Sequence, residues 1–239
     1  MSYPRIIAHR CGGALTPENT LVGLRLAARL GCRGVEFDAM LAADGVPVLI
    51  HDETLERTTS GRGRVAETDS AQLTRLDAGS RHHAAFAAEP LPTLDETLRL
   101  CAALGLWANV EIKPSAGREA ETGRIVARHA AAAGCPGVLS SFSPEALHAA
   151  AAEAPELPRA LLVQTIPTDW RERMAGLGAI ALHSAARGLT AGMAGAVRAA
   201  GFPLACYTVN RREDAERLFA MGVSAVFTDR PDLWLSSEM

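Results

Sequence analysis

The stretch GVEFDAMLAADGVPVLIHDETLERT, residues 34–58, opens with an apolar run of strand character that contains two carboxylates. In a strand, successive side chains point to opposite faces, so Glu36 and Asp38 share one face. Val35 and Phe37 then point to the other face, where helices are expected to pack. Two acidic groups inside a sheet are costly to desolvate unless a cation neutralises them. This strand therefore predicts both a covered sheet and a charged site near its end.

The same stretch contains a predicted hairpin. Asp44-Gly45 is a strong signal for a two-residue turn, and an apolar run at 46–51 follows it. Such a turn places Asp38 opposite His51, and directly opposed side chains share a face with Cβ atoms ~5 Å apart. The hairpin is therefore expected to bring two acidic side chains and one imidazole into one pocket.

Along the rest of the chain, short apolar runs alternate with Ala-, Leu- and Arg-rich segments of helical period. We expect strands at 5–9, 34–40, 107–112, 137–141, 159–163, 178–183, 203–208 and 223–227. We expect helices at 20–31, 93–104, 118–133, 144–153, 168–175, 190–200 and 211–220. Eight strands separated by helices predict a (β/α)8 TIM barrel of the α/β class. An open doubly wound sheet is the alternative, but its GxGxxG motif is absent after the first strand.

Residues 45–91 do not follow this alternation. They add the apolar run of the hairpin and then a polar stretch rich in Gly, Thr, Arg and Ser. We interpret them as a small insertion after the second strand, within a single catalytic domain that covers residues 1–239. Loops at that end of a barrel build active sites and accommodate insertions.

Composition excludes several classes of function. The chain has 239 residues, of which 48% are hydrophobic, and a formal net charge of −3, too small to indicate a nucleic-acid or membrane surface. No apolar run approaches the ~20 residues that span a bilayer, and the N-terminal residues lack the pattern of a signal peptide. The cysteines show neither a zinc pattern nor a disulfide framework. We therefore expect a cytoplasmic protein without stable membrane association.

Further chemically active side chains fall at the ends of predicted strands, where TIM barrels place catalytic groups. The first strand ends at His9 and Arg10, and Lys113 follows the strand at 107–112, two residues after Glu111. Lys113 is the only lysine among 24 basic residues, so it could mark a position that arginine does not serve. We expect these side chains to meet those of the hairpin at one rim of the barrel.

The types of side chain at this rim are those of a metal-dependent phosphodiesterase. Three carboxylates, on Glu36, Asp38 and Glu111, suit one hard divalent cation, Mg²⁺ or Ca²⁺. Two cationic side chains beside them call for an anion, and phosphate is the simplest choice. Two histidines with ordinary pKa values near ~6.5 are suited to acid and base roles at neutral pH. The combination predicts metal-assisted hydrolysis of a phosphodiester.

Each of these residues also has a simpler interpretation. Glu36 and Asp38 could be salt-bridged charges, His9 a structural histidine, and Lys113 a solvated loop charge. His183 also falls at the end of a predicted strand, and a structural role is the simpler interpretation for it. The joint placement of the other residues at one rim favours the active site.

Several segments resemble the glycerophosphodiester phosphodiesterase family, in the family's own order. IAHRCGGALTPENTLVGL is similar to its opening His-Arg and Pro-Glu-Asn-Thr motifs. Residues 34–63 are similar to its Glu-x-Asp, Asp-Gly and His-Asp signature, and NVEIKP, SSF and YTVN…GVSAVFTDRP are similar to its later motifs. The resemblance extends over nearly the whole chain.

The resemblance implies a TIM barrel with a small insertion after the second strand. It implies an enzyme that hydrolyses small-molecule glycerophosphodiesters to sn-glycerol 3-phosphate and an alcohol. The residues that it implies are the metal ligands Glu36, Asp38 and Glu111, the acid–base histidines His9 and His51, and the phosphate-binding Arg10 and Lys113. Of the two histidines, we expect His9 to be the base and His51 the acid. We also expect Phe142 and Tyr207 to line the glycerol or leaving-group side.

Two positions depart from the family pattern. Cys11 replaces the glycine that usually follows His-Arg, and Tyr207 stands where many members have tryptophan, which leaves the leaving-group preference open. Two alternatives to the expected function remain. One is a phospholipase D-like or lyase member of the same superfamily that cleaves lysophospholipids, and the other is a catalytically silent barrel that binds phosphodiesters.

Overall fold

The computed structural model describes residues 3–234. The strands are β1 (Ile6–Ala8), β2 (Gly34–Leu41), β3 (Pro47–Leu49), β4 (Trp107–Ile112), β5 (Gly137–Ser141), β6 (Arg159–Val163), β7 (Ala181–Ala185), β8 (Leu204–Tyr207) and β9 (Ala225–Thr228). The α-helices are α1 (Leu21–Arg29), α2 (Ser70–Leu73), α3 (Leu94–Leu104), α4 (Glu119–Ala133), α5 (Pro144–Glu153), α6 (Trp170–Leu177), α7 (Ala191–Ala199) and α8 (Arg212–Ala220). None of these helices combines the length and the apolar character needed to cross a bilayer.

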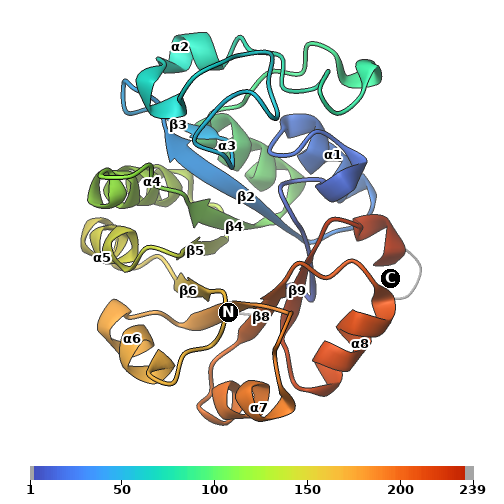
Figure 1. Ribbon diagram of the computed structural model, residues 1–239, viewed down its shortest axis with the longest axis vertical. Coiled ribbons are helices and arrows are strands. Elements are labelled where there is room, and N and C mark those ends of the chain that lie inside the picture. Colours follow the sequence, from blue (N-terminus) through green and yellow to red (C-terminus); the bar gives the residue numbers. More distant parts are fainter. Residues whose placement is uncertain (1–2, 235–239) are drawn as a thin grey trace.

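Within the described residues, eight parallel strands form a closed barrel. They follow the order β1-β9-β8-β7-β6-β5-β4-β2, and pairing of β1 with β2 completes the circle. The helices α1 and α3 to α8 form a ring around the strands, as Figure 1 shows. This arrangement confirms the predicted TIM barrel.

The hairpin forms, but its register differs from the predicted one. The antiparallel strand β3 pairs Val48 with Met40, so Ile50 rather than His51 lies opposite Asp38 and donates its N–H to the Asp38 carbonyl at 3.1 Å. The turn has three residues instead of two, and its last residue, Gly45, has φ +81°. A third turn residue with positive φ is common in hairpins, and it shifts the pairing by one residue. The expectation that His51 directly opposes Asp38 is therefore wrong.

Strand β7 begins three residues later than predicted, at Ala181 rather than at Gly178. Gly178 has φ +58° and is the C-terminal cap of helix α6, and the N–H of Ala179 bonds the carbonyl of Met174. Glycine commonly takes this left-handed position because it has no Cβ. The first residues of the predicted strand, from Gly178, therefore belong to the end of helix α6 and the connection after it.

Side chains of alternate strand residues fill separate layers. Val35, Phe37 and Ala39 of β2 pack outward against α1, α3 and α4, as predicted from the strand alternation. The barrel interior below the strand ends is filled by Ile7, Trp107 and alanines of β6 to β9. Tyr3 closes this lower end, with its ring centroid 4.9 Å from that of Trp107. The cavity of the barrel therefore lies toward the C-terminal ends of the strands.

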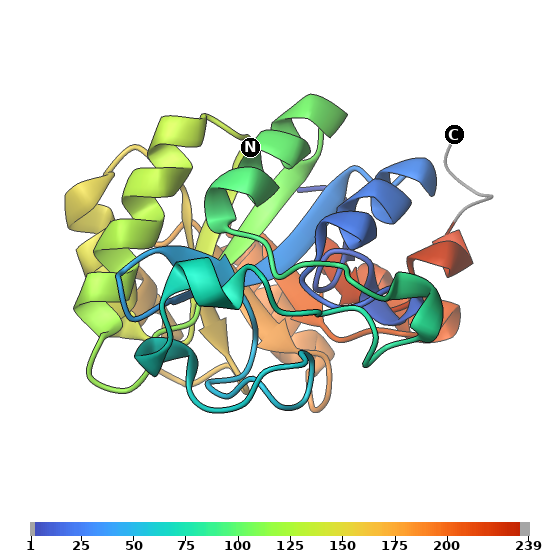
Figure 2. The same ribbon diagram turned by 90° about the horizontal axis from the view of Figure 1, so that it is seen from above.

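The chain between β3 and α3 forms a separate layer on one side of the barrel. It contains α2 and the 3₁₀ helices η2 (Val65–Glu67) and η3 (Ala84–Phe86), and Figures 1 and 2 show it beside β3. A cluster of buried side chains, including Ile50, Leu55 and Leu73, attaches this segment to the end of β2. The attachment holds the residues that follow β3 close to the barrel rim.

Helices α4 and α5 pack so closely that a methyl group does not fit between them. A Cβ added at Gly123 of α4 would lie 2.1 Å from the carbonyl oxygen of Ala146 in α5. Gly123→Ala is therefore expected to lower the free energy of unfolding by ~1–3 kcal/mol, measured by urea denaturation. Gly195→Ala in α7 is the matched control, because its Cβ meets nothing within 4 Å. The control should gain up to ~1 kcal/mol from helix propensity, and equal effects at both sites would contradict the packing argument.

Candidate active site

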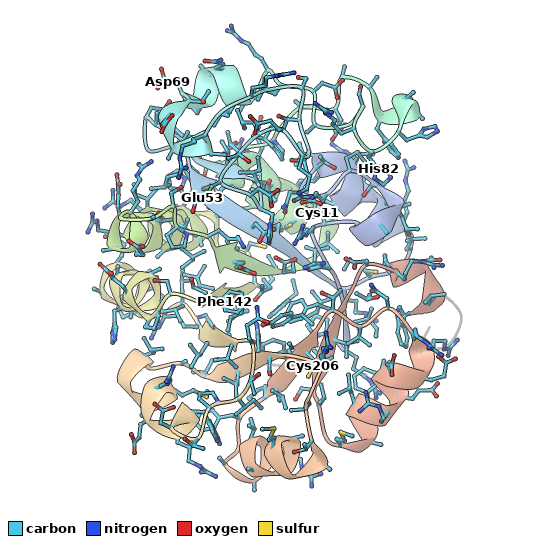
Figure 3. The ribbon with its side chains drawn as sticks, in the orientation of Figure 1. Cys11, Glu53, Asp69, His82, Phe142 and Cys206 are labelled. Atoms are coloured by element: carbon cyan, nitrogen blue, oxygen red, sulfur yellow. The ribbon has the colours of Figure 1, made fainter. Side chains whose placement is uncertain are left out.

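A cavity of about 160 Å³ opens at the C-terminal ends of the barrel strands. All nine site residues expected from the sequence line it: His9, Arg10, Glu36, Asp38, His51, Glu111, Lys113, Phe142 and Tyr207. Figure 3 shows Phe142 beside the strand ends, near the middle of the barrel. The other lining residues are Asn109, Leu162, Gln164, His183, Thr208 and Phe227. Folding therefore brings residues from six strands, and from the segments that follow several strands, to one place.

The acidic side chains come from neighbouring strands. Asp38 of β2 is the register partner of Glu111 in β4, and Glu36 lies one side-chain repeat below Asp38. The three residues offer oxygen atoms that all lie within 4.8 Å of one another. Burial and the charge of Asp38 raise the pKa of Glu36 to about 7 and that of Glu111 to about 8. The cluster is therefore electrostatically unfavourable by itself, and a divalent cation would relieve the repulsion.

The residues of this cluster fit a hard cation. All three offer carboxylate oxygens, which Mg²⁺ and Ca²⁺ prefer. Glu36 Oε1 is buried and has no hydrogen-bond partner among the described residues. Asp38 is oriented by Asn19, whose Nδ2 donates to Asp38 Oδ2 at 2.9 Å. A buried carboxylate oxygen without a donor is uncommon in folded proteins and is consistent with an ionic partner.

Arg10 lies on one side of the cluster. Its backbone N–H donates to Glu36 Oε2 at 2.8 Å, and its Nη1 donates to Glu18 Oε1 at 2.9 Å. Its Nε is buried 3.8 Å from Asp38 Oδ2 and has no hydrogen-bond partner in the described chain. Glu18 thus holds the guanidinium through Nη1, and the N–H at Nε remains able to donate a hydrogen bond to a ligand in the cavity.

Lys113 lies on the other side of the cluster. Its Nζ is 3.5 Å from Glu111 Oε1 and 4.0 Å from Asp38 Oδ1. The same Nζ lies 3.0 Å from His51 Nε2. An ammonium group can only donate hydrogen bonds, so this contact makes His51 Nε2 the acceptor. Lys113 therefore connects the acidic cluster with the imidazole.

The two histidines differ in the charge that surrounds them. His9 Nδ1 donates to Asp229 Oδ1 at 2.7 Å, and His9 Nε2 lies 3.8 Å from Glu36 Oε2. Burial lowers the pKa of His9, but the hydrogen bond to Asp229 and the charges of Glu36 and Asp229 outweigh it, so the pKa is raised. For His51, burial prevails and the pKa is lowered, despite its hydrogen bond to Asp52. The two pKa values therefore move apart.

The comparison with protein families agrees with this geometry. A model described as the glycerophosphoryl diester phosphodiesterase family matches residues 9–233. The chain belongs to this family. It is therefore an enzyme, and the interpretation as a catalytically silent barrel is set aside.

Relatives of this glycerophosphoryl diester phosphodiesterase family member match nearly all of its length. A glycerophosphodiester phosphodiesterase of Caldanaerobacter subterraneus is 32% identical over 95% of this chain and 94% of its own. A putative glycerophosphodiester phosphodiesterase of Bacillus subtilis is 31% identical over 95% of each chain. Among solved structures, an Oleispira antarctica phosphodiesterase in complex with the product sn-glycerol-3-phosphate has a TM-score of 0.93 and 37% identity. That match covers 96% of this chain and 94% of the other.

Two aromatic rings form one wall of the site in this phosphodiesterase. Phe142 is 41% exposed, and its ring meets that of Tyr207 edge to face at 6.1 Å. The hydroxyl of Tyr207 donates to the carbonyl of Val163 at 2.7 Å, which fixes the ring. The wall adds aromatic surface to a cavity that also contains the charged side chains.

Several supporting residues were not selected from the sequence as site residues. Asp229, directly after β9, accepts a hydrogen bond from His9. Asp52, in the segment after β3, accepts one from the adjacent His51. Their position at strand ends was a usable signal, since barrels gather functional groups there. Asn19 precedes helix α1 and resembles a capping residue, yet its side chain binds Asp38 instead. No sequence pattern distinguishes these two uses of asparagine.

Arg57 connects the two carboxylates that hold His51 and Arg10. Its guanidinium donates to Asp52 Oδ2 at 2.5 Å and to both oxygens of Glu18 at 2.7 and 2.8 Å. Asp52 holds His51, and Glu18 holds Arg10. One exposed arginine from the segment after β3 thus fixes the relative position of an imidazole and a guanidinium in the cavity.

Arg57→Ala is expected to lower kcat/KM by about 10- to 100-fold, because small misplacements of reacting groups cost about that much. Arg57→Lys should recover little, since lysine cannot bind two carboxylates through a planar fork. Arg64→Ala is the control: Arg64 is equally exposed, at 47% against 46%, but pairs with Glu53 away from the cavity. Steady-state kinetics check both variants, and equal losses would contradict a positioning role.

Proposed function

We propose that the protein hydrolyses glycerophosphodiesters to sn-glycerol 3-phosphate and an alcohol. The observation that carries the proposal is the convergence of three carboxylates, two cationic side chains and two imidazoles in one cavity of a chain of this family. The Oleispira antarctica phosphodiesterase was solved in complex with the product sn-glycerol-3-phosphate, which agrees with this choice of substrate. We also propose that the chain acts as one catalytic domain, with residues 45–91 supplying His51 and its supports. The cytoplasmic location stays a prediction from the sequence.

Glu36, Asp38 and Glu111 are proposed to hold one divalent cation, Mg²⁺ or Ca²⁺. Such a cation, when bound, polarises the phosphoryl group and offsets its negative charge. The raised pKa values of the two glutamates and the unpartnered Glu36 Oε1 support this assignment.

Arg10 and Lys113 are proposed to bind the non-bridging phosphate oxygens. They lie on opposite sides of Asp38, at 3.8 and 4.0 Å from its carboxylate oxygens. Donors held in place before the reaction stabilise the charge that develops in the transition state. Because Glu18 and Glu111 position these cations, binding of phosphate requires little rearrangement.

His51 and His9 are proposed to carry the proton transfers. His51 Nε2 accepts a hydrogen bond from Lys113, and the pKa of His51 is lowered, so His51 suits the base that takes a proton from the nucleophile. His9 has a raised pKa, and its Nε2 lies on the side of Glu36 rather than of Asp229, so His9 suits the acid that protonates the departing alcohol. This assignment exchanges the two roles expected from the sequence, because the sequence did not show that Asp229 and Glu36 lie beside His9 and Lys113 beside His51.

The aromatic wall is proposed to contact the glycerol or the leaving group. Phe142 and Tyr207 both line the cavity with their rings in contact, and Phe142 is 41% exposed. Apolar rings there can cover the substrate's carbon atoms without competing for the phosphate.

One assay tests the function. Purified protein with Mg²⁺ is incubated with glycerophosphocholine, and release of sn-glycerol 3-phosphate is measured by a coupled dehydrogenase. We expect the protein to release sn-glycerol 3-phosphate from glycerophosphocholine. We expect it not to cleave lysophosphatidylcholine. Cleavage of the lysolipid alone would favour the phospholipase D-like or lyase alternative, and cleavage of neither would contradict the proposal.

A further inference from the structure

Four residues of the cavity each contain a buried side-chain atom that lacks a hydrogen-bond partner within residues 3–234. These atoms are Arg10 Nε, Glu36 Oε1, Asn109 Oδ1 and His183 Nδ1. The first two belong to the proposed phosphate and metal positions. The other two have no part in the proton transfers or in binding of phosphate. A buried polar atom without a partner destabilises the fold, so a partner for each is expected when substrate is bound.

Asn109 and His183 line the cavity from strands β4 and β7. Asn109 is two residues before Glu111 on β4, on the same face, and it pairs in register with Glu36. His183 pairs in register with Leu162, another cavity residue, and its ring lies 5.1 Å from that of Phe227. Both Asn109 and His183 are only 1% exposed. They therefore form part of the floor of the cavity.

The orientation of the Asn109 amide is fixed by its neighbour. Its Nδ2 donates to Ser140 Oγ at 3.0 Å, which leaves Oδ1 as the unpaired atom. This oxygen is a hydrogen-bond acceptor only. The floor therefore offers an acceptor on the β4 side.

His183 offers an uncharged ring nitrogen from β7. Burial lowers the pKa of His183 to about 3, and its Nε2 lies 3.1 Å from the hydroxyl of Tyr3. Burial also raises the pKa of Tyr3, so this hydroxyl keeps its proton and can donate to Nε2. The remaining ring hydrogen then lies on Nδ1, which becomes a donor. An acceptor and a neutral donor suit a hydroxyl group, which can both donate and accept, better than an ion.

We propose that Asn109 and His183 form a subsite for the terminal hydroxyl of the substrate's glycerol group and thereby select glycerol diesters. The inference rests on the proposed function, which places the phosphate between Arg10 and Lys113. The glycerol hydroxyl next to the ester then stays near the carboxylates, and the terminal hydroxyl reaches farthest from the phosphate. A water molecule held permanently by the same two atoms is the competing occupant.

The test compares two substrates with the same leaving group. Glycerophosphocholine has both glycerol hydroxyls, and the phosphocholine diester of propane-1,2-diol, esterified at its primary oxygen, lacks only the terminal one. The second substrate keeps the hydroxyl beside the ester, so attack on phosphorus by water or by that hydroxyl is equally available in both substrates. We expect the kcat/KM of the wild type to fall about 10- to 100-fold on the second substrate, as expected for an unpaired buried site.

Two variants of His183 test whether this residue causes the difference in kcat/KM between the two substrates. Asparagine places a polar atom about where Nδ1 lies, and glutamine places one about where Nε2 lies, because of their different side-chain lengths. His183→Asn is therefore expected to keep the ratio of the two kcat/KM values. In His183→Gln the two kcat/KM values should differ by less than about 3-fold. Asn109→Leu should reduce the ratio in the same way, and thermal unfolding shows whether each variant is folded.

Each outcome of these measurements supports or overturns the subsite. A wild type that hydrolyses both diesters equally well would overturn the subsite while leaving the proposed function intact, and would favour the permanent water. An unchanged ratio in folded His183→Gln and Asn109→Leu would also overturn it. If neither diester is hydrolysed, the proposed function fails. Calorimetry with sn-glycerol 3-phosphate and propane-1,2-diol 1-phosphate then decides the subsite, and equal affinities would contradict it.

Discussion

His51→Ala and His9→Ala are each expected to lower kcat by ~10²–10⁴-fold, the usual contribution of a positioned acid or base. The two variants should differ in their pH profiles. Loss of the base, His51, should remove the fall in kcat/KM on the acidic side, and loss of the acid, His9, should remove the fall on the alkaline side. Initial rates across pH 5–9 with glycerophosphocholine and Mg²⁺ measure both effects.

Asp229→Asn is the control for the role of His9. The hydrogen bond and charge of Asp229 help raise the pKa of His9, so their removal should lower it. An acid works only below its pKa, and the alkaline limb should therefore move to lower pH while His9 remains in place. Retention of activity within about tenfold by either alanine variant would contradict the acid–base roles.

Chelation of divalent cations is expected to abolish turnover and to make stability depend on pH. The folded-state pKa values of Glu36 and Glu111 are raised to about 7 and about 8. A raised pKa means that the folded state favours the protonated carboxyl. Its stabilising contribution is complete below the unfolded pKa near ~4.5 and is lost as the pH rises through the folded value. In EDTA, Tm should therefore fall between pH 5 and pH 8.

Added Mg²⁺ should reverse this loss at pH 8, because a cation binds the deprotonated cluster. At a concentration of ~100 times Kd, binding adds ~2.7 kcal/mol, or about 5–10 °C in Tm for a chain of this size. Glu36→Gln removes one charge and one ligand, so both the pH dependence in EDTA and the response to Mg²⁺ should become smaller. Unchanged turnover in EDTA, or no Tm response to Mg²⁺, Ca²⁺ or Mn²⁺, would argue against the metal site.

The sequence by itself predicted the order of strands and helices around the barrel and nine of the side chains that line the cavity. Strands β4, β5 and β6 begin and end at the predicted residues, because their apolar runs are bounded by clear turn and cap signals. Side-chain alternation placed Glu36 and Asp38 on the inner face of β2 and Phe37 on the outer face, and the structure agrees. Alternation depends only on backbone geometry, so it is readable without knowledge of the fold.

Only the tertiary structure decided the register of the hairpin and the surroundings of each titratable group. The turn that ends at Gly45 holds three residues rather than two, and in this register side chains after β3 pack against the end of β2. Likewise, Asp229 and Lys113 are far from their histidines in sequence, and they reach them only when the barrel closes. A pKa depends on charges and burial within a few ångströms, and these distances between remote residues are set by the closed barrel rather than by local sequence.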